Sequence, residues 1–216
     1  AEYEGHLDKH TTGRRPTGSY IPRFRNLYRQ ETDFLRGYAA GFGAGRIIHQ
    51  DTDGIGLALK NGLLNPKFGN WYLGAGMMGE TIPKENSRVS INNEQTDPYG
   101  LPQLKIAIDY DENDEKMLED FFEQFTEMFE AAGFKNIKTR DTKQAPGLDI
   151  HEMGGVRMGK DPKTSLLNKW NQLHTCKNVY VTDGACMTST GTQNPSLTFM
   201  ALTARACNHA IKESKS

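Results

Sequence analysis

Three short segments in the last third of the chain carry side chains suited to proton transfer and ligand binding. His151 ends an apolar step and is followed by two glycines, and Asp183 ends a segment typical of a buried strand. Asn194 precedes Pro195 at the start of a helical pattern. An imidazole accepts a proton near neutral pH, a carboxylate accepts hydrogen bonds from hydroxyl groups, and a helix N-terminus offers N–H groups to an electron-rich ligand atom. Each feature alone also fits a structural role.

Local signals define the elements around these residues. Residues 178–184, with Val179, Tyr180 and Val181, predict a buried strand that ends in Asp-Gly, and a loop of small residues follows it. Asn194 is expected at the N-cap and Pro195 at the first position of the next helix. The apolar stripe of that helix recurs at helical spacing in Leu197, Met200, Ala201, Ala204, Cys207 and Ile211. The sequence therefore predicts strand, loop and helix N-terminus in that order.

The rest of the chain predicts an α+β fold in which helices cover an antiparallel sheet. Apolar and polar residues alternate over residues 104–110, which predicts a strand with one buried face. The helix that follows is expected to cover this strand and to end before Gly133 at its C′ position. Its apolar stripe is Leu118, Phe121, Phe122, Phe125, Met128, Phe129 and Ala132. Further strands are expected at residues 19–24, 34–48, 71–82, 87–91 and 136–139, and a short helix at residues 55–64.

Two glycine clusters resemble phosphate-binding loops but do not meet the requirements of one. Residues 41–45 lack a third glycine at the required spacing, and no helix start follows them. In residues 54–59, Leu59 stands at the third glycine position and no hydrophobic strand precedes the cluster. A strand with glycine-lightened faces is the better interpretation of residues 34–48, and a ligand or another sheet could approach such a strand closely.

Composition and charge exclude several classes of function. The chain has 216 residues with 26 Lys and Arg against 27 Asp and Glu, so its net charge of −1 gives no preference for nucleic acid. The first thirty residues are basic and loop-like. No apolar run approaches the roughly 20 residues of a membrane-spanning helix. The three cysteines are too few for a disulfide framework, and we expect them as small buried hydrophobes. The chain begins at Ala1 without a signal-peptide pattern, and we expect it to be part of a longer protein.

Three ordered blocks of residues indicate a family. The first is His151-x-x-Gly154-Gly155-x-Arg157-Met158-Gly159 and the second is Asn178-Val179-Tyr180-Val181-x-Asp183-Gly184. The third is Asn194-Pro195-x-Leu197-Thr198 with Ala201-x-x-Ala204-Arg205-Ala206. Together, over residues 147–213, they resemble the C-terminal signature of the glucose-methanol-choline (GMC) flavin oxidoreductases. The resemblance is nearest to the bacterial sugar and sugar-acid dehydrogenases and pyranose oxidases, which pair histidine with asparagine.

The resemblance implies a role for each matching residue. His151 matches the catalytic histidine, which accepts the proton of a substrate hydroxyl while hydride passes to the flavin. Asn194 matches the second catalytic position and is expected to orient the hydroxyl or the developing alkoxide. Asp183 and Gly184 match the dipeptide beside the ribityl and pyrophosphate of FAD. The helix start is expected to meet the flavin through Pro195, Ser196, Leu197 and Thr198, the N–H groups being those after the proline.

The same resemblance implies that part of the FAD site lies outside this chain. Family members bind FAD through an N-terminal strand, a glycine-rich turn and a helix, and neither glycine cluster fits that unit. We expect residues 1–146 to form a substrate-binding domain and residues 147–216 a catalytic segment that returns to the FAD domain. The strand and helix at 178–213 would then leave apolar surface without its sheet neighbours, and the piece alone would be inactive.

The resemblance favours a sugar, polyol or sugar acid as substrate and leaves open the electron acceptor and the cellular compartment. Two alternatives remain. One is a non-catalytic carbohydrate-binding domain whose glycine-lightened sheet holds its ligand with Tyr38, Phe42, Trp71 and Tyr72. The other is a purely structural subunit.

Overall fold

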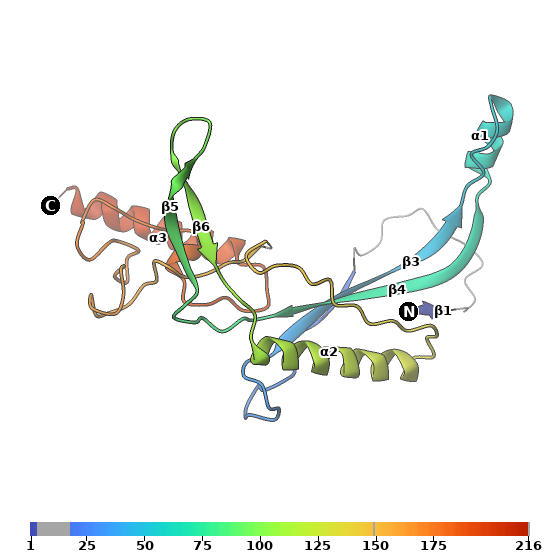
Figure 1. Ribbon diagram of the computed structural model, residues 1–216, viewed down its shortest axis with the longest axis horizontal. Helices are drawn as coiled ribbons and strands as arrows, with labels where there is room; N and C mark the ends of the chain where they lie inside the picture. Colours follow the sequence, from blue (N-terminus) through green and yellow to red (C-terminus); the bar gives the residue numbers. More distant parts are fainter. Residues whose placement is uncertain (4–17, 149, 216) are drawn as a thin grey trace. The chain divides into compact units, whose positions relative to one another are not determined.

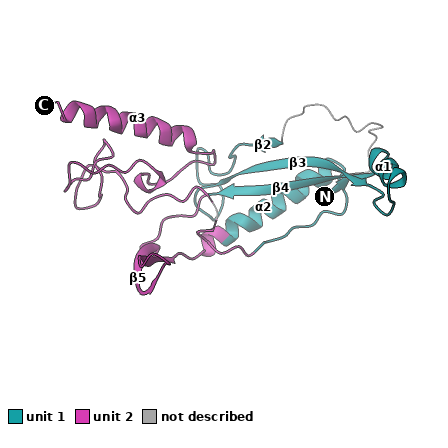
Figure 2. Ribbon diagram, turned by 90° about the horizontal axis from the view of Figure 1, so that it is seen from above, with its two compact units in different colours: residues 1–79, 115–142 teal, residues 80–114, 143–216 magenta. Residues whose placement is uncertain are grey.

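The computed structural model describes residues 1–3, 18–148 and 150–215, which divide into two compact units (Figure 2). Unit 1 consists of residues 1–79 and 115–142, and unit 2 of residues 80–114 and 143–216. Residues 4–17 of the basic N-terminal segment expected from the sequence lie outside the described residues.

Unit 1 is built on a four-stranded antiparallel sheet with the order β1-β4-β3-β2 (Figure 1). Its strands are β1 (Glu2–Tyr3), β2 (Ser19–Ile21), β3 (Tyr38–His49) and β4 (Lys67–Gly79). β3 and β4 pair from Tyr38 with Gly79 to His49 with Lys67, and α1 (Leu57–Leu64) lies in the connection between them. The strands expected at 19–24, 34–48 and 71–82 and the helix at 55–64 are thereby confirmed. The glycine cluster 41–45 lies inside β3 and forms no phosphate-binding turn.

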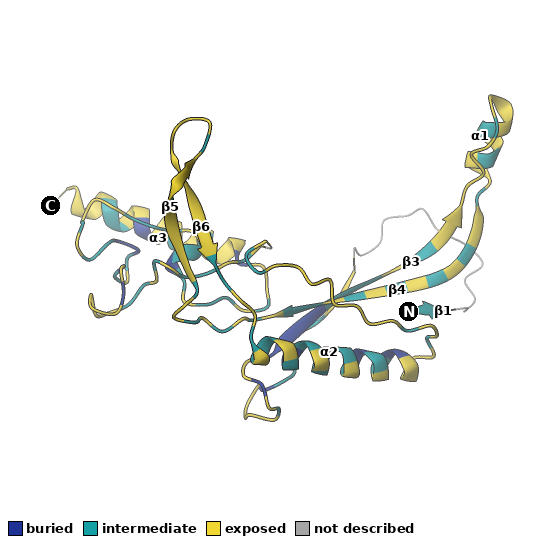
Figure 3. Ribbon diagram, in the orientation of Figure 1, coloured by how far each residue is buried: buried dark blue, intermediate teal, exposed yellow. Residues whose placement is uncertain are grey.

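The core of unit 1 forms where α2 (Glu112–Ala131) packs on this sheet. Met117, Phe121, Phe125 and Phe129 repeat every fourth residue, so they share one helix face, and each is at most 6 % exposed. They pack against residues of β3 and β4, and in Figure 3 the buried start of β3 lies beside α2. The predicted aromatic core stripe is confirmed.

The apolar stripe of α2 covers the four-stranded sheet of unit 1, whereas the sequence predicted that it covers the strand at residues 104–110. Strand β6 (Pro102–Ala107) pairs only with β5 (Arg88–Thr96) in an antiparallel hairpin of unit 2. Leu104 and Ile106 are 68 % and 54 % exposed, so the prediction of a buried face over residues 104–110 is wrong. The alternation itself is correct, because the register aligns the apolar pairs Ile91 with Leu104 and Val89 with Ile106. A period of two specifies which residues share a face but not what covers that face.

Two other predicted strands do not form. In residues 178–184 only Tyr180 makes a bridge, with Gln172, and Val179 is 37 % exposed. In residues 136–139 there is no strand, and the neighbouring Lys135 makes one bridge to Glu2. A strand needs a partner ladder for its backbone groups, and the described part of the chain offers these two segments only isolated bridges. The expected C′ position of Gly133 is confirmed by its φ of 83°.

A buried polar cluster ties α2 to the sheet of unit 1. Asp120 accepts hydrogen bonds from Arg25 at 2.7 and 2.9 Å and from the Tyr38 hydroxyl at 2.6 Å. Tyr38 is fully buried, and burial together with the Asp120 carboxylate raises the pKa of Tyr38 well above its ordinary value. The phenol therefore stays protonated and donates to the carboxylate, so Arg25 and Tyr38 both depend on Asp120 as their acceptor.

A second buried polar group, Asn171, organises unit 2. Its side chain is fully buried, donates to the Val181 carbonyl at 3.0 Å and accepts from the Arg205 guanidinium at 3.0 Å. The backbone carbonyl of Asn171 accepts from the Val181 N–H at 2.9 Å. The φ of Asn171 is 63°, in the left-handed region, which asparagine tolerates better than most residues. Arg205 belongs to α3 (Ser196–Glu213), so one amide connects the loop at 168–174, the segment at 181 and this helix.

The Asp120 cluster predicts a marked loss of stability when the carboxylate is removed. We expect Asp120→Ala to lower the free energy of unfolding by about 3 kcal/mol, because it leaves a buried phenol and a half-buried guanidinium without their acceptor. Urea denaturation followed by far-UV circular dichroism measures the change. Glu119→Ala, at the adjacent exposed position of α2, should change it by less than about 0.5 kcal/mol. Equal stability of the two variants would contradict this account.

Truncation of Asn171 should loosen unit 2 locally. We expect Asn171→Ala to lower the free energy of unfolding by about 2 kcal/mol, because the half-buried Val181 carbonyl loses its side-chain donor and Arg205 its acceptor. Amide hydrogen exchange of residues 181–186 should accelerate. Lys163→Ala is the control, since Lys163 is exposed in a nearby loop. Unchanged exchange at 181–186 in Asn171→Ala would show that the amide does not hold this segment.

Candidate functional site

Backbone hydrogen bonds place the segment after His151 beside the segment that carries Asp183 and Gly184. N–H groups of residues 154–158 donate to carbonyl oxygens of residues 184–186 over 2.9–3.1 Å. The pairs are Gly154 with Gly184, Val156 with Ala185, and Met158 with Cys186. Segments far apart in the sequence thus run side by side within unit 2.

Gly184 lies where this ladder meets the first turn of α3. A Cβ atom at Gly184 would come within 2.5 Å of the Glu152 carbonyl oxygen and 3.5 Å of the Phe199 ring. Such a contact with the backbone is too short for a real side chain, so only glycine fits here without moving the chain. The structure therefore brings together the residue after His151, the Asp183–Gly184 dipeptide and the start of α3.

His151 is half-buried and has a φ of 76°, in the left-handed region that residues with a side chain rarely adopt. Such a conformation costs roughly 1–3 kcal/mol and is found most often at functional sites. Gly154 and Gly155 follow with φ values of 94° and 90°. A Cβ atom at either would have no contact closer than 3.8 Å, so the backbone conformation, rather than lack of space, calls for these glycines. The segment is a tight, unusual turn.

Asp183 uses one carboxylate oxygen inside the chain. Its Oδ1 accepts from the Ala185 N–H at 3.0 Å and caps the short 3-10 helix η1 (Gly184–Cys186). The residue is exposed, and the structure gives Oδ2 no partner among the described residues. The second oxygen is therefore positioned to accept a hydrogen bond from outside the chain.

The start of α3 differs by one residue from the expected cap. Pro195 occupies the N-cap position and is buried, whereas Asn194 lies before it and is exposed. The side chain of Asn194 makes no cap hydrogen bond, because the helix begins one residue later than its spacing suggested. The prediction that Pro195 is the first helical residue and Asn194 the cap is wrong by that one position. Ser196, Leu197 and Thr198 are exposed and carry the first free N–H groups of the helix.

One face of α3 packs within unit 2 and the predicted apolar stripe does not. Ala206 is buried and Phe199 and Leu202 are half-buried. Leu197, Met200 and Ile211 of the stripe are 78 %, 68 % and 52 % exposed. Among the described residues, these three side chains of the stripe are left exposed.

In unit 1, the sheet face away from α2 is rich in glycine. Gly41 pairs with Gly76, and Gly43 with Gly74. A Cβ atom at Gly74 or Gly76 would meet nothing within 4 Å, so no described neighbour calls for glycine there. An open hollow of about 590 Å³ lies over these residues and Tyr20.

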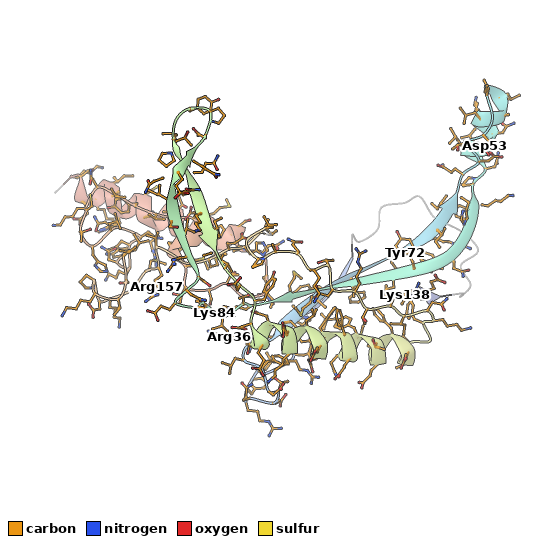
Figure 4. All side chains as sticks on the ribbon, viewed as in Figure 1. Arg36, Asp53, Tyr72, Lys84, Lys138 and Arg157 are labelled. Atoms are coloured by element: carbon orange, nitrogen blue, oxygen red, sulfur yellow. The ribbon has the colours of Figure 1, made fainter. Side chains whose placement is uncertain are left out.

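The four aromatic residues proposed to hold a carbohydrate do not share this face. Tyr38 is fully buried in the core. Phe42 and Trp71 lie on the same side of the sheet as Tyr38, toward α2, because every second residue along a strand points to the same face. Tyr72, labelled in Figure 4, is on the opposite side, where it lies over Gly45. The shared aromatic surface required by that alternative is absent from these four described residues.

Several residues of unit 2 were not identified from the sequence. Trp170 stacks on His209 with ring centroids 4.8 Å apart, so His209 is not a free surface histidine. Asn171 and the packing of Arg205 have no sequence signal, because a buried polar partner is recognised only after the chain has folded. Of the cysteines, Cys186 is buried as expected, and Cys207 is exposed, contrary to the prediction.

Metal-binding and membrane features are not found in the part of the chain that the structure describes. No group of three or more His, Cys, Asp or Glu residues there could hold a metal ion. Among the same residues, no helix combines the length and the apolar character needed to cross a bilayer.

Known proteins resemble the chain over most of its length. It is 32 % identical to 2-methyl-1,2-propanediol dehydrogenase of Mycolicibacterium austroafricanum over 83 % of this chain and 35 % of that protein. It is 28 % identical to the fructose dehydrogenase large subunit of Gluconobacter japonicus over 63 % of this chain and 24 % of that protein. The 6'''-hydroxyparomomycin C oxidase of Streptomyces lividus is 31 % identical over 62 % of this chain and 23 % of that protein. The chain thus spans about a third or less of these relatives.

The family model described as GMC oxidoreductase matches residues 83–203. This range contains the His151 turn, the Asp183–Gly184 dipeptide and the first turn of α3, which the backbone ladder and the contacts of Gly184 bring together. With more than half of its residues matched, the chain belongs to the GMC oxidoreductase family.

Proposed function

We propose that this chain is part of an FAD-dependent oxidoreductase that oxidises a CH–OH group of a sugar, polyol or sugar acid. The observation that carries the proposal is the ladder joining residues 154–158 to residues 184–186, because it connects the strained His151 turn to the Asp183–Gly184 dipeptide. Family membership supports the reaction class. The names of the relatives, a propanediol dehydrogenase and a fructose dehydrogenase subunit among them, support a hydroxylated substrate.

His151 is the proposed base. Its imidazole accepts the proton of the substrate hydroxyl, and the left-handed backbone at this residue fixes the direction in which the ring leaves the chain. Bound FAD would supply the acceptor of the hydride. Asn194 is the proposed orienting group, since its exposed amide both donates and accepts hydrogen bonds and carries no charge that would oppose a developing alkoxide.

The residues present fit the flavin end of the cofactor. The exposed Oδ2 of Asp183 suits a ribityl hydroxyl, and Gly184 lets the Glu152 backbone pack closely beside this carboxylate. The free N–H groups at Ser196, Leu197 and Thr198 form the positive end of α3 and suit an electron-rich ring atom. Pro195 contributes shape alone, because it has no N–H.

The glycine-rich sheet face of unit 1 is the proposed substrate side of the protein. Its open hollow and the absence of any described neighbour at Gly74 and Gly76 suit a close external layer. We further propose that residues 1–146 form a substrate-binding domain and residues 147–216 a catalytic segment. The adenine and pyrophosphate site would come from an N-terminal half of the same protein. The non-catalytic carbohydrate-binding alternative is weaker, since its aromatic residues lie on two faces.

Replacement of the base should separate catalysis from flavin binding. In the full-length protein, we expect His151→Ala to retain its yellow flavin and to lower kcat by about 1,000-fold, because the proton has no acceptor in the transition state. The measurement is the rate of flavin bleaching after anaerobic addition of a panel of sugars, polyols and sugar acids. His49→Ala, at an exposed position of β3, should bleach at the parent rate. A colourless parent protein would overturn the proposed function.

Removal of the Asn194 amide should affect the turnover step more than substrate binding. We expect Asn194→Ala to lower kcat by about 100-fold with a small change in KM, because the amide acts mainly on developing charge. Asn194→Asp should be slower still, since a carboxylate repels an alkoxide. Gln193→Ala at the neighbouring exposed position is the control. A pure rise in KM would assign Asn194 to substrate binding instead.

A further inference from the structure

Unit 2 contains a second pocket that the proposed reaction does not use. It has a volume of about 580 Å³, within the range of small-molecule sites. The side chains that matter for its chemistry are Met158, Lys160, Lys169, Trp170, His174 and Arg205. None of the residues proposed as catalytic or flavin-binding is in its lining.

The lining of the pocket is mostly apolar, and every charged residue in it is basic. Lys160, Lys169 and Arg205 line it, and no Asp or Glu does. Among the described residues, none of these three cations forms a salt bridge. Arg205 donates to the Asn171 amide oxygen and, at 3.5 Å, to the Met158 sulfur. Both acceptors are neutral, so the positive charge of the guanidinium is not compensated within this network.

The same pocket has a rigid apolar wall. Trp170 is fixed by its backbone N–H, which donates to the Asn168 side chain at 2.8 Å, and by the stacked ring of His209. The Lys169 ammonium lies 5.0 Å from the centroid of the indole ring. His174, which also lines the pocket, is held by a 3.2 Å hydrogen bond with Ser165. A ligand would therefore meet a preformed apolar surface beside positive charges.

We propose that this pocket binds a small organic anion, namely a carboxylate or phosphate ester with an apolar body. The anionic group pairs with Lys160, Lys169 and Arg205, of which Arg205 is held in place by Asn171. The apolar body lies against Trp170 and Met158. An ion without an apolar part would leave this wall in water, and a neutral ring would leave the cations unpaired. The proposal rests on unit 2 alone and does not depend on the proposed reaction.

Isothermal titration calorimetry of the full-length, flavin-containing protein tests this with three probes. Benzoate carries both features, acetate lacks the apolar body and benzamide lacks the charge. We expect benzoate to bind at least tenfold more tightly than either. Phenyl phosphate serves as the second anion and shows whether a carboxylate or a phosphate is preferred. Comparable binding of benzoate and benzamide would overturn the proposal, because the cations would then contribute nothing.

Variants assign the binding to this pocket. The double variant Lys160→Gln/Lys169→Gln should bind benzoate at least tenfold more weakly, because two of the three cations are lost. Lys163→Gln is the matched control, since this lysine is exposed in the same loop but does not line the pocket. It should bind within twofold of the parent. Circular dichroism confirms folding of each variant. Unchanged benzoate affinity in the double variant would place the binding elsewhere, for example beside the flavin, and would overturn the proposal.

Discussion

Unit 2 depends on the buried amide of Asn171. Most of this unit is loop, with the β5–β6 hairpin and α3 as its extended elements, so few regular ladders hold it together. One side chain with a donor and an acceptor connects the Val181 carbonyl to the Arg205 guanidinium, and its own backbone pairs with Val181. A buried amide is costly unless both its groups are paired, and these hydrogen bonds therefore favour the observed arrangement of the three segments.

The arrangement set by Asn171 places both sites of unit 2. Val181 leads directly into Asp183 and Gly184, whose backbone carries the ladder to the His151 turn. Arg205 is tied to the same amide and lines the cationic pocket. The proposed flavin contacts and the proposed anion pocket thus share one structural support, although no lining residue of the pocket belongs to the flavin set.

In unit 1, one face of the sheet is covered by α2 and the other is open. One face carries aliphatic and aromatic residues that pack against α2, and the Asp120 cluster fixes the helix in place. The other face consists largely of glycines and leaves the hollow open. The apolar surfaces that remain exposed, on α3 and the β5–β6 hairpin, are those that further parts of a longer protein would cover under the proposed function.

The sequence alone determined the long periodic elements and the candidate site residues, whereas the tertiary structure decided their neighbours. The stripe of α2, the glycines of β3 and the approximate start of α3 follow from local spacing, which every residue carries regardless of the fold. The partner of α2, the exposure of Leu104 and the absence of a strand at 178–184 do not, because burial and ladder pairing depend on segments distant in sequence. His151 and Asp183 were recognisable as residue types in a family pattern. The backbone ladder that brings their segments together, and the amide of Asn171 that supports it, exist only in the folded chain, since hydrogen bonds between distant residues leave no periodic trace in the sequence.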